Sequence, residues 1–182
     1  MFANLSRDEI AVLALIAGLA DERGIFNRGR DAKKLTKLAF LASYAEEVDS
    51  NGIRLRGNPR LGLRFHVYLY GVASKDIYGI LDRLVEKGFL EHVDINIYSV
   101  KVSLNEVLGV VRRMDDDLYR GVVFALSYRY MTGDELEGFV NGLLGIGGPE
   151  IKALVYGTEV QKLIEAREHV KKLEEKDMIV DI

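Results

Sequence analysis

The sequence predicts an α+β fold that is predominantly α-helical, and three observations support this class. Apolar residues recur at three- and four-residue spacing along most of the chain, which is the periodicity of amphipathic helices. Two short runs rich in β-forming residues follow directly after one helical segment. The 182 residues, 48% of them hydrophobic, can bury one substantial core. We therefore expect one compact unit with few strands.

Two helices are predicted at the N-terminus. Ser6 and Glu9 form a Ser-x-x-Glu capping box, which predicts a helix over residues 7–23. A glycine-containing break follows, and residues 31–48 then show a second amphipathic pattern for which Asp31 is a suitable cap. The residues of this second helix expected to face solvent are Lys33, Lys34 and Lys37.

A long connection follows the second helix. Residues 51–62 contain four glycine or proline positions and several arginines, which predicts an exposed loop. Residues 63–70 alternate between apolar and polar side chains and predict a strand, which Gly71 then turns toward the next helix.

The stretch from Ser74 to Ser103 is the most informative part of the chain. Ser74 is placed to cap a helix that Gly88 ends, and its apolar residues have helical spacing. Residues 89–93 and 98–102 then predict a β-hairpin around a turn at residues 94–96. A helix followed by such a hairpin is the second half of a winged helix. The expected centre of the protein is therefore winged-helix-like, with the hairpin as its wing.

Extra helices are predicted after the wing. Residues 105–118, 119–131 and 132–144 read as three short helices, the last opened by a Thr132–Glu135 capping box. The glycine-rich linker 145–149 precedes a final amphipathic helix over residues 150–175. We thus divide the chain into a core domain, 1–148, and a C-terminal helical segment, 149–182. That helix either packs on its own chain or joins two chains, and we favour a homodimer because a glycine linker lets the helix reach a second copy.

Composition narrows the range of functions. The chain has no cysteine, which removes disulfides and thiolate metal sites and suits a cytoplasmic protein. Its longest apolar run, residues 10–20, is too short for a membrane span. Acidic residues precede that run and no cleavage pattern follows, so we expect no export and no membrane partner. The high content of charged residues is a weak indication of a thermophilic source organism.

Enzyme chemistry has little support in the sequence. His66, His92 and His169 are scattered over different predicted elements, and a lone histidine is usually structural. The glycines of residues 145–148 lack the Gly-Lys-Ser/Thr ending of a phosphate-binding loop. Residues 115–117 are three consecutive aspartates, which we interpret as a solvated helix junction because they cannot all face one point. We therefore expect no catalytic residue, no metal site and no cofactor.

Basic residues cluster although the net charge is −3. The segment between Ser50 and Lys75 contains no acidic residue, and its arginines are spaced along a glycine-rich loop. Such guanidinium groups can bind backbone phosphates without reading sequence. A solvated loop, or the docking of an acidic protein surface, explains the same pattern equally well. The basic residues are Arg54, Arg56, Arg60, Arg64 and Lys75.

The helix after Ser74 is the expected recognition helix, but its charges cancel. Lys75, Arg83 and Lys87 are balanced by three acidic residues, whereas a strong phosphate-binding helix is more basic. Tyr78 is expected at its surface, where it can stack on a base. Simple packing of this helix and contact with DNA or protein are equally compatible with the pattern.

Two pieces of sequence carry a family resemblance. Residues 34–41 read Lys-Leu-Thr-Lys-Leu-Ala-Phe-Leu, and residues 65–74 read Phe-His-Val-Tyr-Leu-Tyr-Gly-Val-Ala-Ser. Over residues 31–103 this order resembles the YwgA-like family of archaeal and bacterial proteins and, more distantly, the Panacea, or SocA-like, antitoxin domain. Val72 and Ala73 stand where those families have Pro and Tyr. The Panacea resemblance implies binding to a protein, as an antitoxin or adaptor, rather than catalysis.

We therefore predict a DNA-binding protein, a transcriptional regulator that uses the winged-helix-like motif and needs no cofactor. The alternative is a non-enzymatic protein-interaction module such as an antitoxin-like adaptor. The predicted nucleic-acid contacts are Arg54, Arg56, Arg60, Arg64, Lys75, Tyr78, Arg83 and Lys87.

Overall fold

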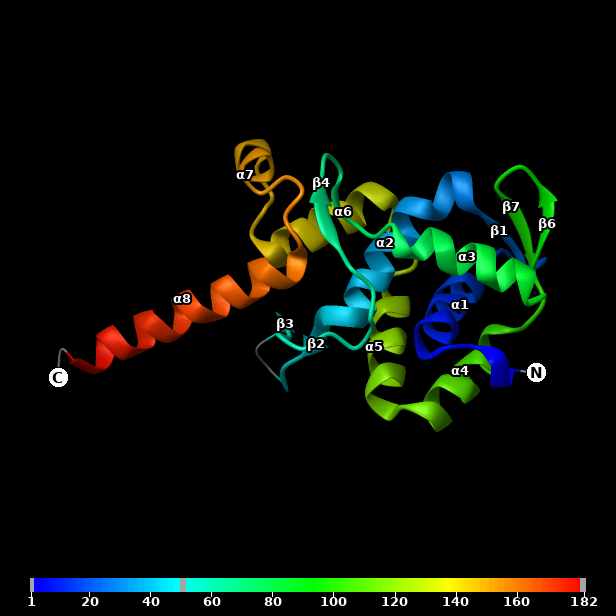
Figure 1. The fold of residues 1–182 in the computed structure, drawn as a ribbon, viewed down its shortest axis with the longest axis horizontal. Helices are drawn as coiled ribbons and strands as arrows, with labels where there is room; N and C mark the ends of the chain where they lie inside the picture. Colours follow the sequence, from blue (N-terminus) through cyan, green and yellow to red (C-terminus); the bar gives the residue numbers. More distant parts are fainter. Residues whose placement is uncertain (1, 50–51, 181–182) are drawn as a thin grey trace.

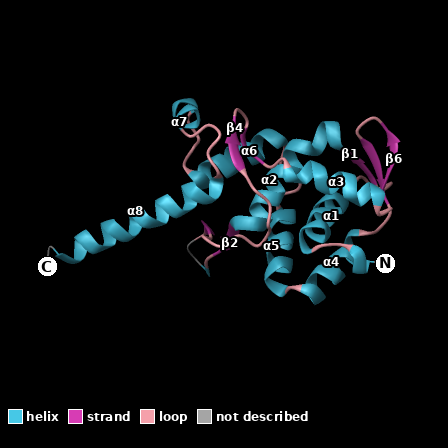
Figure 2. Cartoon of the chain, in the orientation of Figure 1, coloured by secondary structure: helices cyan, strands magenta, loops and turns pink. Residues whose placement is uncertain are grey.

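The computed structural model describes residues 2–49 and 52–180 of the protein. A helical body holds most of the chain, and the C-terminal helix α8 projects from it (Figure 1). Strands form only small antiparallel sheets among the helices (Figure 2). The predicted class, α+β with predominant helix, is confirmed.

Helix α1 (Arg7–Leu19) forms the centre of the core. The predicted capping box is present, since the Ser6 side chain accepts a hydrogen bond from the Glu9 N–H while the Ser6 N–H donates to Glu9 Oε2. Every residue from Glu9 to Ile16 is buried, so α1 is enclosed by other elements on most sides. The helix ends earlier than residue 23 because the chain turns into β1 (Ile25–Asn27).

Helix α2 (Arg28–Tyr44) begins and ends earlier than predicted. Its cap is Asn27, whose side chain accepts the Arg30 N–H at 3.1 Å. The predicted cap Asp31 lies inside the helix instead, is buried, and pairs with Arg30 at 2.7 Å. Strand β1 runs directly into α2 and so places Asn27, rather than Asp31, at the start of the helix.

Two hairpins connect α2 to α3. Strand β2 (Ala45–Glu47) pairs with β3 (Ile53–Leu55), and β4 (His66–Tyr68) pairs with β5 (Gly71–Ala73). The predicted loop 51–62 therefore contains a strand, and only three residues of the predicted strand 63–70 pair as one. Asn51, at the start of that predicted loop, lies outside the described residues.

Gly71 is needed at the turn of the second hairpin. Its φ is +78°, in the left-handed region that favours glycine. A Cβ atom there would lie 2.3 Å from Asn141 Oδ1, so a side chain has no room. Glycine therefore lets β5 pack closely against α6.

The centre of the fold has winged-helix connectivity. Helix α3 (Asp76–Glu86) leads into β6 (Leu90–Asp94) and β7 (Ile97–Val100), and the turn between these strands has Asn96 in the left-handed conformation. Strand β1 pairs antiparallel with β7, giving the sheet order β1-β7-β6. The sequence α1, β1, α2, α3, β6, β7 with β1 beside β7 is that of a winged helix, and the two hairpins are inserted between α2 and α3.

Three helices complete the body after the wing. They are α4 (Leu104–Met114), α5 (Asp116–Ser127) and α6 (Gly133–Leu144). The predicted boundary at Leu118 was wrong because Asp115 ends α4 and its side chain caps α5 by accepting the Leu118 N–H at 2.9 Å. Helix α5 approaches α2 closely at Gly121, where a Cβ atom would lie 2.5 Å from the Ala42 carbonyl oxygen.

The C-terminal segment contains two helices where one was predicted. Helix α7 (Pro149–Leu154) is separated from α8 (Val160–Val180) by a turn in which Gly157 has a φ of +78°. The first turns of α8 pack against the body through buried Val160 and Ile164. Farther along, Val170 and Leu173 of the predicted apolar stripe are about half exposed, so the stripe is divided between packing and solvent.

Candidate functional site

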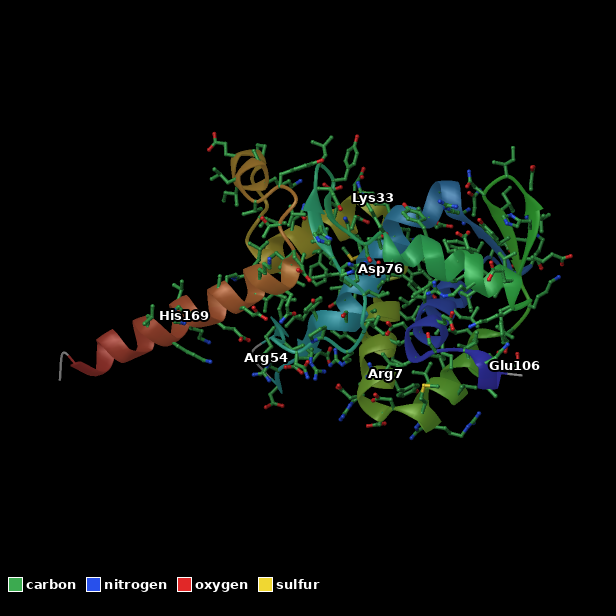
Figure 3. All side chains as sticks on the ribbon, in the orientation of Figure 1. Arg7, Lys33, Arg54, Asp76, Glu106 and His169 are labelled. Carbon is green, nitrogen blue, oxygen red and sulfur yellow. The ribbon has the colours of Figure 1, made fainter. Side chains whose placement is uncertain are left out.

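The eight predicted contact residues do not form one surface. Figure 3 labels Arg54 near the β2–β3 hairpin and Asp76 at the start of α3, on a different part of the body. The eight residues lie in three places. Arg54, Arg56 and Arg60 lie on and after β3, and Arg64, Lys75 and Tyr78 lie around the start of α3. Arg83 and Lys87 lie at the end of α3.

Arg60 is a buried structural residue, so its predicted exposure in a loop was wrong. Its guanidinium donates to the carbonyl oxygens of Ala42 at 3.3 Å, in the last turn of α2, and of Ala45 at 2.7 Å, the residue after the helix. Its Nε donates to Asp117 on α5 at 3.0 Å. Arg60 thereby binds unpaired carbonyl groups near the α2 terminus and links them to α5.

The three consecutive aspartates are the partners of several arginines. Asp117 also accepts from Arg56 at 2.7 Å, and Asp115 accepts from Arg7 Nε at 3.0 Å. Burial alone would raise the pKa of Asp117, but the hydrogen bonds from Arg56 and Arg60 hold it below its ordinary value. The predicted helix junction is present and Asp116 is exposed there, but Asp115 and Asp117 are partly buried and paired, so the interpretation as solvated is wrong for these two. These carboxylates connect the N-terminus of α5 to segments far away in the sequence.

Arg54 and Arg64 are more exposed, and each has a carboxylate partner. Arg54 Nε lies 2.6 Å from Glu46 across the β2–β3 hairpin. Arg64 pairs with Asp76 at 3.2 Å, and its backbone N–H also donates to that carboxylate at 2.8 Å. Exposed pairs of this kind are weakened by the surrounding water and contribute little to stability.

Glu9 binds both cations at the end of α3. Its two oxygens accept from Arg83 at 2.7 Å and from Lys87 at 2.8 Å, while the Ser6 N–H provides a third hydrogen bond. Burial alone would raise the pKa of Glu9, but these hydrogen bonds lower it from 4.5 to about 2. The second half of α3 is therefore attached to α1, and the exposed charges left there are acidic Asp82 and Glu86.

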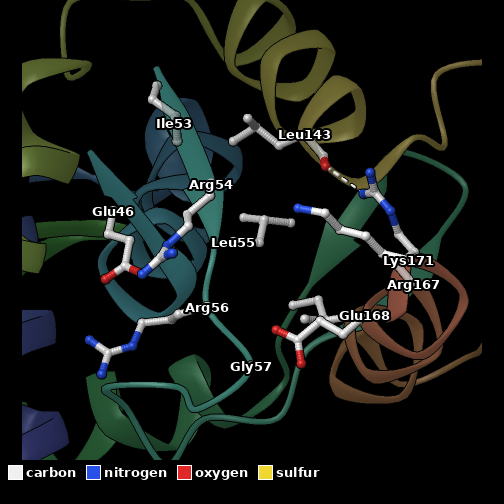
Figure 4. A pocket seen from close by; sticks show the side chains of 11 residues that line it. Glu46, Ile53, Arg54, Leu55, Arg56, Gly57, Leu143, Arg167, Glu168 and Lys171 are labelled. Atoms are coloured by element: carbon white, nitrogen blue, oxygen red, sulfur yellow. Dashed lines mark hydrogen bonds and ion pairs between the residues drawn. The ribbon is translucent and has the colours of Figure 1, made fainter. Parts of the chain in front are cut away.

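A cleft lies between β3 and α8. It has a volume of about 600 Å³ and carries Arg54, Arg56, Arg167 and Lys171 together with two glutamates. In Figure 4 the Arg54 side chain points toward Glu46, and Arg167 donates to the Leu143 carbonyl oxygen at 2.7 Å. Arg54 and Arg56 thus have carboxylate partners. Neither Arg167 nor Lys171 has an ion pair within the described residues, and Glu168 is the other acidic group of this cleft.

At the start of α3, in contrast to the cleft between β3 and α8, an arginine lies beside an aromatic ring and not beside a carboxylate. The Arg28 guanidinium lies 4.6 Å from the centre of the Tyr78 ring, in a cation–π contact between the first turns of α2 and α3. Lys75 is exposed just before α3. Among the described residues, neither Arg28 nor Lys75 lies within ion-pair distance of a carboxylate. The Tyr78 side chain is 42% exposed.

Lys37 was predicted to face solvent and is instead buried, with 2% of its surface exposed. Its ammonium group donates to the carbonyl oxygens of Tyr70 at 2.9 Å and Val72 at 2.5 Å, across the β4–β5 hairpin. Burial, which disfavours the charged form, lowers the pKa of Lys37 to about 8. The hairpin inserted before α3 covers this face of α2 and so removes Lys37 from water.

Lys37 lines a cleft of about 500 Å³ between α2, the β4–β5 hairpin and the start of α3. We call it the tyrosine–lysine cleft because three tyrosines and three lysines line it. Ordinary small-molecule sites have this size and combine apolar walls with a few polar groups. The tyrosines and lysines are Tyr68, Tyr70, Tyr78, Lys33, Lys37 and Lys75.

Ser74 also lines the tyrosine–lysine cleft, and its predicted role as helix cap was wrong. Lys75 occupies the cap position of α3, and the Ser74 side chain is turned into the protein with 2% of its surface exposed. Its hydroxyl oxygen has no hydrogen-bond partner among the described residues. A buried hydroxyl without a partner costs roughly 1–3 kcal/mol, which makes it notable in a cleft.

Lys33 is also at this cleft, but its charge is balanced. It pairs with Asp134 at 2.6 Å and with Glu137, both on α6, and it lies 5.6 Å from the Tyr70 ring centre. Tyr70 itself is largely exposed at the hairpin tip. Consequently Lys37 and Lys75 are the cleft lysines that have no ion pair in the described part of the chain.

Sequence reasoning missed Lys37, Ser74 and Arg28 as site residues. The helical periodicity predicted that Lys37 faces solvent, because the residues near it in the sequence do not show that the β4–β5 hairpin covers it. One signal was available. Lys37 and Ser74 both lie within the two sequence pieces that carry the family resemblance, residues 34–41 and 65–74.

Comparison of the chain with models of protein families, with curated proteins and with solved structures finds no match. Within residues 2–49 and 52–180, no helix combines the length and apolar composition needed to cross a membrane. The same residues include no group of three or more histidine or acidic side chains arranged to hold a metal ion.

Proposed function

We propose that the protein binds DNA as a cytoplasmic, winged-helix transcriptional regulator through the N-terminal ends of α2 and α3. The observation that carries this proposal is the placement of Arg28, Lys75 and Tyr78 together at the start of α3, with no carboxylate paired to either cation in the described chain. In a winged helix this helix is the one that enters the major groove.

The chemistry of these helix ends suits a duplex. The N-terminal residues of a recognition helix contact base edges, which gives Lys75 donors for guanine and Tyr78 an aromatic face at the groove. Arg28 is the first residue of α2, and a guanidinium at a positive helix terminus favours a phosphate. We therefore propose that α2 contacts the phosphate backbone and α3 contacts the bases.

The other predicted contact residues lie outside the proposed interface. Arg56, Arg60, Arg83 and Lys87 would have to leave carboxylates before they could bind phosphate. The wing adds little positive charge, since its tip carries exposed Val93, Asp94 and Ile95. We therefore restrict the proposed interface to the first turns of the two helices.

The test is fluorescence anisotropy with a mixed-sequence duplex over a salt series. The double variant Arg28→Ala with Lys75→Ala is compared with Arg54→Ala with Arg113→Ala, which removes the same charge from β3 and from exposed α4. Loss of the Arg28 phosphate contact reduces the slope of log affinity against log salt by about 1 in the first variant, and loss of the Lys75 base contact lowers the affinity further. An equal effect of the control pair, or the absence of duplex binding by the wild type at low salt, would contradict the proposal.

A second candidate function is a protein-interaction module, favoured by a different observation. The tip of the β4–β5 hairpin and the α7 region expose Leu69, Tyr70, Leu154 and Tyr156, and a second cleft of about 500 Å³ lies between them. Exposed apolar patches of this kind commonly mark protein contacts. On this alternative the partner, such as a toxin bound by an adaptor, covers the hairpin tip.

Self-association through α8 remains part of the proposal. Val170 and Leu173 are about half exposed on the projecting part of this helix, where a second copy could cover them. Light scattering should give a dimer for the wild type and a monomer for Val170→Ser with Leu173→Ser. Leu69→Ser with Leu154→Ser is the matched control, because it removes two exposed apolar residues from the hairpin tip and α7. A monomeric wild type would contradict dimerisation through α8.

A further inference from the structure

We infer that the tyrosine–lysine cleft binds a small aromatic molecule that carries one carboxylate. The carboxylate would contact Lys37 and Ser74, and the aromatic part would lie against the tyrosine side chains. Two independent features support this site, namely a buried cation without an ion pair and a buried hydroxyl without a partner, both among the described residues.

The polar groups fit a carboxylate. A lysine ammonium has three N–H donors, and Lys37 uses two of them on the Tyr70 and Val72 carbonyl oxygens. Ser74 can donate its hydroxyl hydrogen as well. One carboxylate oxygen can therefore accept from Lys37 and the other from Ser74, and charge-assisted hydrogen bonds of this kind are the strong ones.

The charge of the cleft fits a monoanion. Asp134 and Glu137 already balance Lys33, so the buried positive charge that lacks a carboxylate is that of Lys37. A charge in this position is costly without a counter-ion. One bound carboxylate would supply that counter-ion, whereas a doubly charged group would require further buried donors.

The walls fit an aromatic body. Besides the tyrosines, the cleft is lined by apolar Ala32, Val72 and Ala73, and its volume is about 500 Å³. Tyrosine rings pack well against other aromatic rings in offset or edge-on arrangements. A two-ring aromatic compound with a short acidic arm therefore matches the space and the chemistry.

This site has a regulatory consequence that rests on the proposed DNA-binding function. Lys75 and Tyr78 line the cleft and also belong to the proposed DNA interface. A ligand that draws these side chains toward the cleft competes with the duplex for them. The bound carboxylate would therefore lower the affinity of the protein for DNA, and by linkage DNA would lower the affinity for the carboxylate.

The first experiment is isothermal titration calorimetry of the full chain with indole-3-acetate, and with indole-3-acetamide as the uncharged control of the same shape. We expect saturable binding of the acid and at least about tenfold weaker binding of the amide, because the amide lacks the charge that Lys37 requires. Equal affinities for the two compounds, or no saturable binding of the acid at millimolar concentrations, overturns the proposal.

Variants locate the site. Lys37→Met should weaken binding of the acid by at least about tenfold, and Ser74→Ala should weaken it severalfold, since each removes one hydrogen bond to the carboxylate. Lys34→Met is the matched control, because Lys34 lies on the same helix and does not line the cleft. Circular dichroism checks that each variant is folded. Unchanged binding in folded Lys37→Met and Ser74→Ala overturns the assignment.

The regulatory step is tested separately by repeating the duplex titration with saturating indole-3-acetate. Severalfold weaker DNA binding with the acid, and no change with the amide, supports the competition. Unchanged DNA affinity overturns the competition but leaves the ligand site in place. The calorimetry contains no DNA, so the failure of the proposed DNA function cannot be confused with the failure of the ligand site.

Discussion

Two basic regions of this protein differ in what surrounds their charges. The arginines of residues 54–64 each pair with a carboxylate, on β2, on α5 or at the start of α3. By contrast, Arg28 and Lys75 at the first turns of α2 and α3, and Lys37 farther along α2, have no ion pair within the described residues. The richer arginine segment therefore offers less free charge than the sparser region.

This difference shows that a cluster of basic residues in the sequence indicates phosphate binding only if those residues have no acidic partners in the fold. An arginine held by carboxylate and carbonyl oxygens must lose those bonds before it can bind a phosphate. A buried pair broken in this way leaves an uncompensated charge, which costs several kcal/mol. Cations without such partners, such as Arg28 and Lys75, lose mainly water, so binding of phosphate is better sought where they lie.

The largest expected effect is on the paired side of the comparison. Arg60→Met should lower the free energy of unfolding by roughly 3–5 kcal/mol, because the carbonyl oxygens of Ala42 and Ala45 and the carboxylate of Asp117 lose a buried donor. Urea denaturation followed by circular dichroism measures this loss.

Arg54→Met is the control for that measurement. It makes the same replacement at an exposed arginine with one partner, Glu46, and should change stability by less than about 1 kcal/mol. Equal losses in the two variants would show that burial of the ion pair does not separate Arg60 from Arg54.

A second effect concerns Glu9, which neutralises the end of α3. Glu9→Gln should lower stability by about 3 kcal/mol at neutral pH, because Arg83 and Lys87 lose their shared carboxylate. The pKa of Glu9 is lowered from 4.5 to about 2 in the folded protein, so its stabilisation is complete above pH 4.5 and is lost as the pH falls toward 2.

The difference between wild type and Glu9→Gln should accordingly shrink over that acid range. Unfolding curves of both proteins at a series of acidic pH values measure the difference, and the many other carboxylates cancel in it. A constant difference down to pH 2 would mean that Glu9 has an ordinary pKa and is not the anchor of α3.

The smallest effect is expected on the unpaired side. Lys37→Met should change stability at neutral pH by less than about 1 kcal/mol, because loss of two hydrogen bonds is offset by removal of a costly buried charge. Thermal unfolding beside Arg60→Met tests whether the same type of substitution has a much smaller effect at Lys37 than at Arg60.

The stability of wild type and Lys37→Met at alkaline pH tests the burial of Lys37 more directly. Burial lowers the pKa of Lys37 from 10.5 to about 8, with Glu137, Lys33 and Lys152 as its charged neighbours. The unfolded chain therefore holds more protons between these values, and wild-type stability relative to Lys37→Met should rise from pH 8 to pH 10.5. An equal response of both proteins would place Lys37 in water.

Much of the local structure could be predicted because its causes are local. The capping boxes of Ser6 with Glu9 and Thr132 with Glu135 fix helix starts within four residues of sequence. The wing follows from two β-rich runs and a turn at Asn96. The candidate site was predicted only in part, since Lys75 and Tyr78 belong to it while Lys37, Ser74 and Arg28 were missed.

By itself, the sequence determined the helical periods, the caps, the turns and hence the winged-helix-like order of elements, because each depends on residues a few positions apart. Only the tertiary structure decided which charges are available. Arg60 meets Asp117 across 57 residues, and Lys37 is buried by carbonyl groups more than 30 residues away. The free energy of a charge depends on the partners and the water around it, and these are set by packing between distant segments.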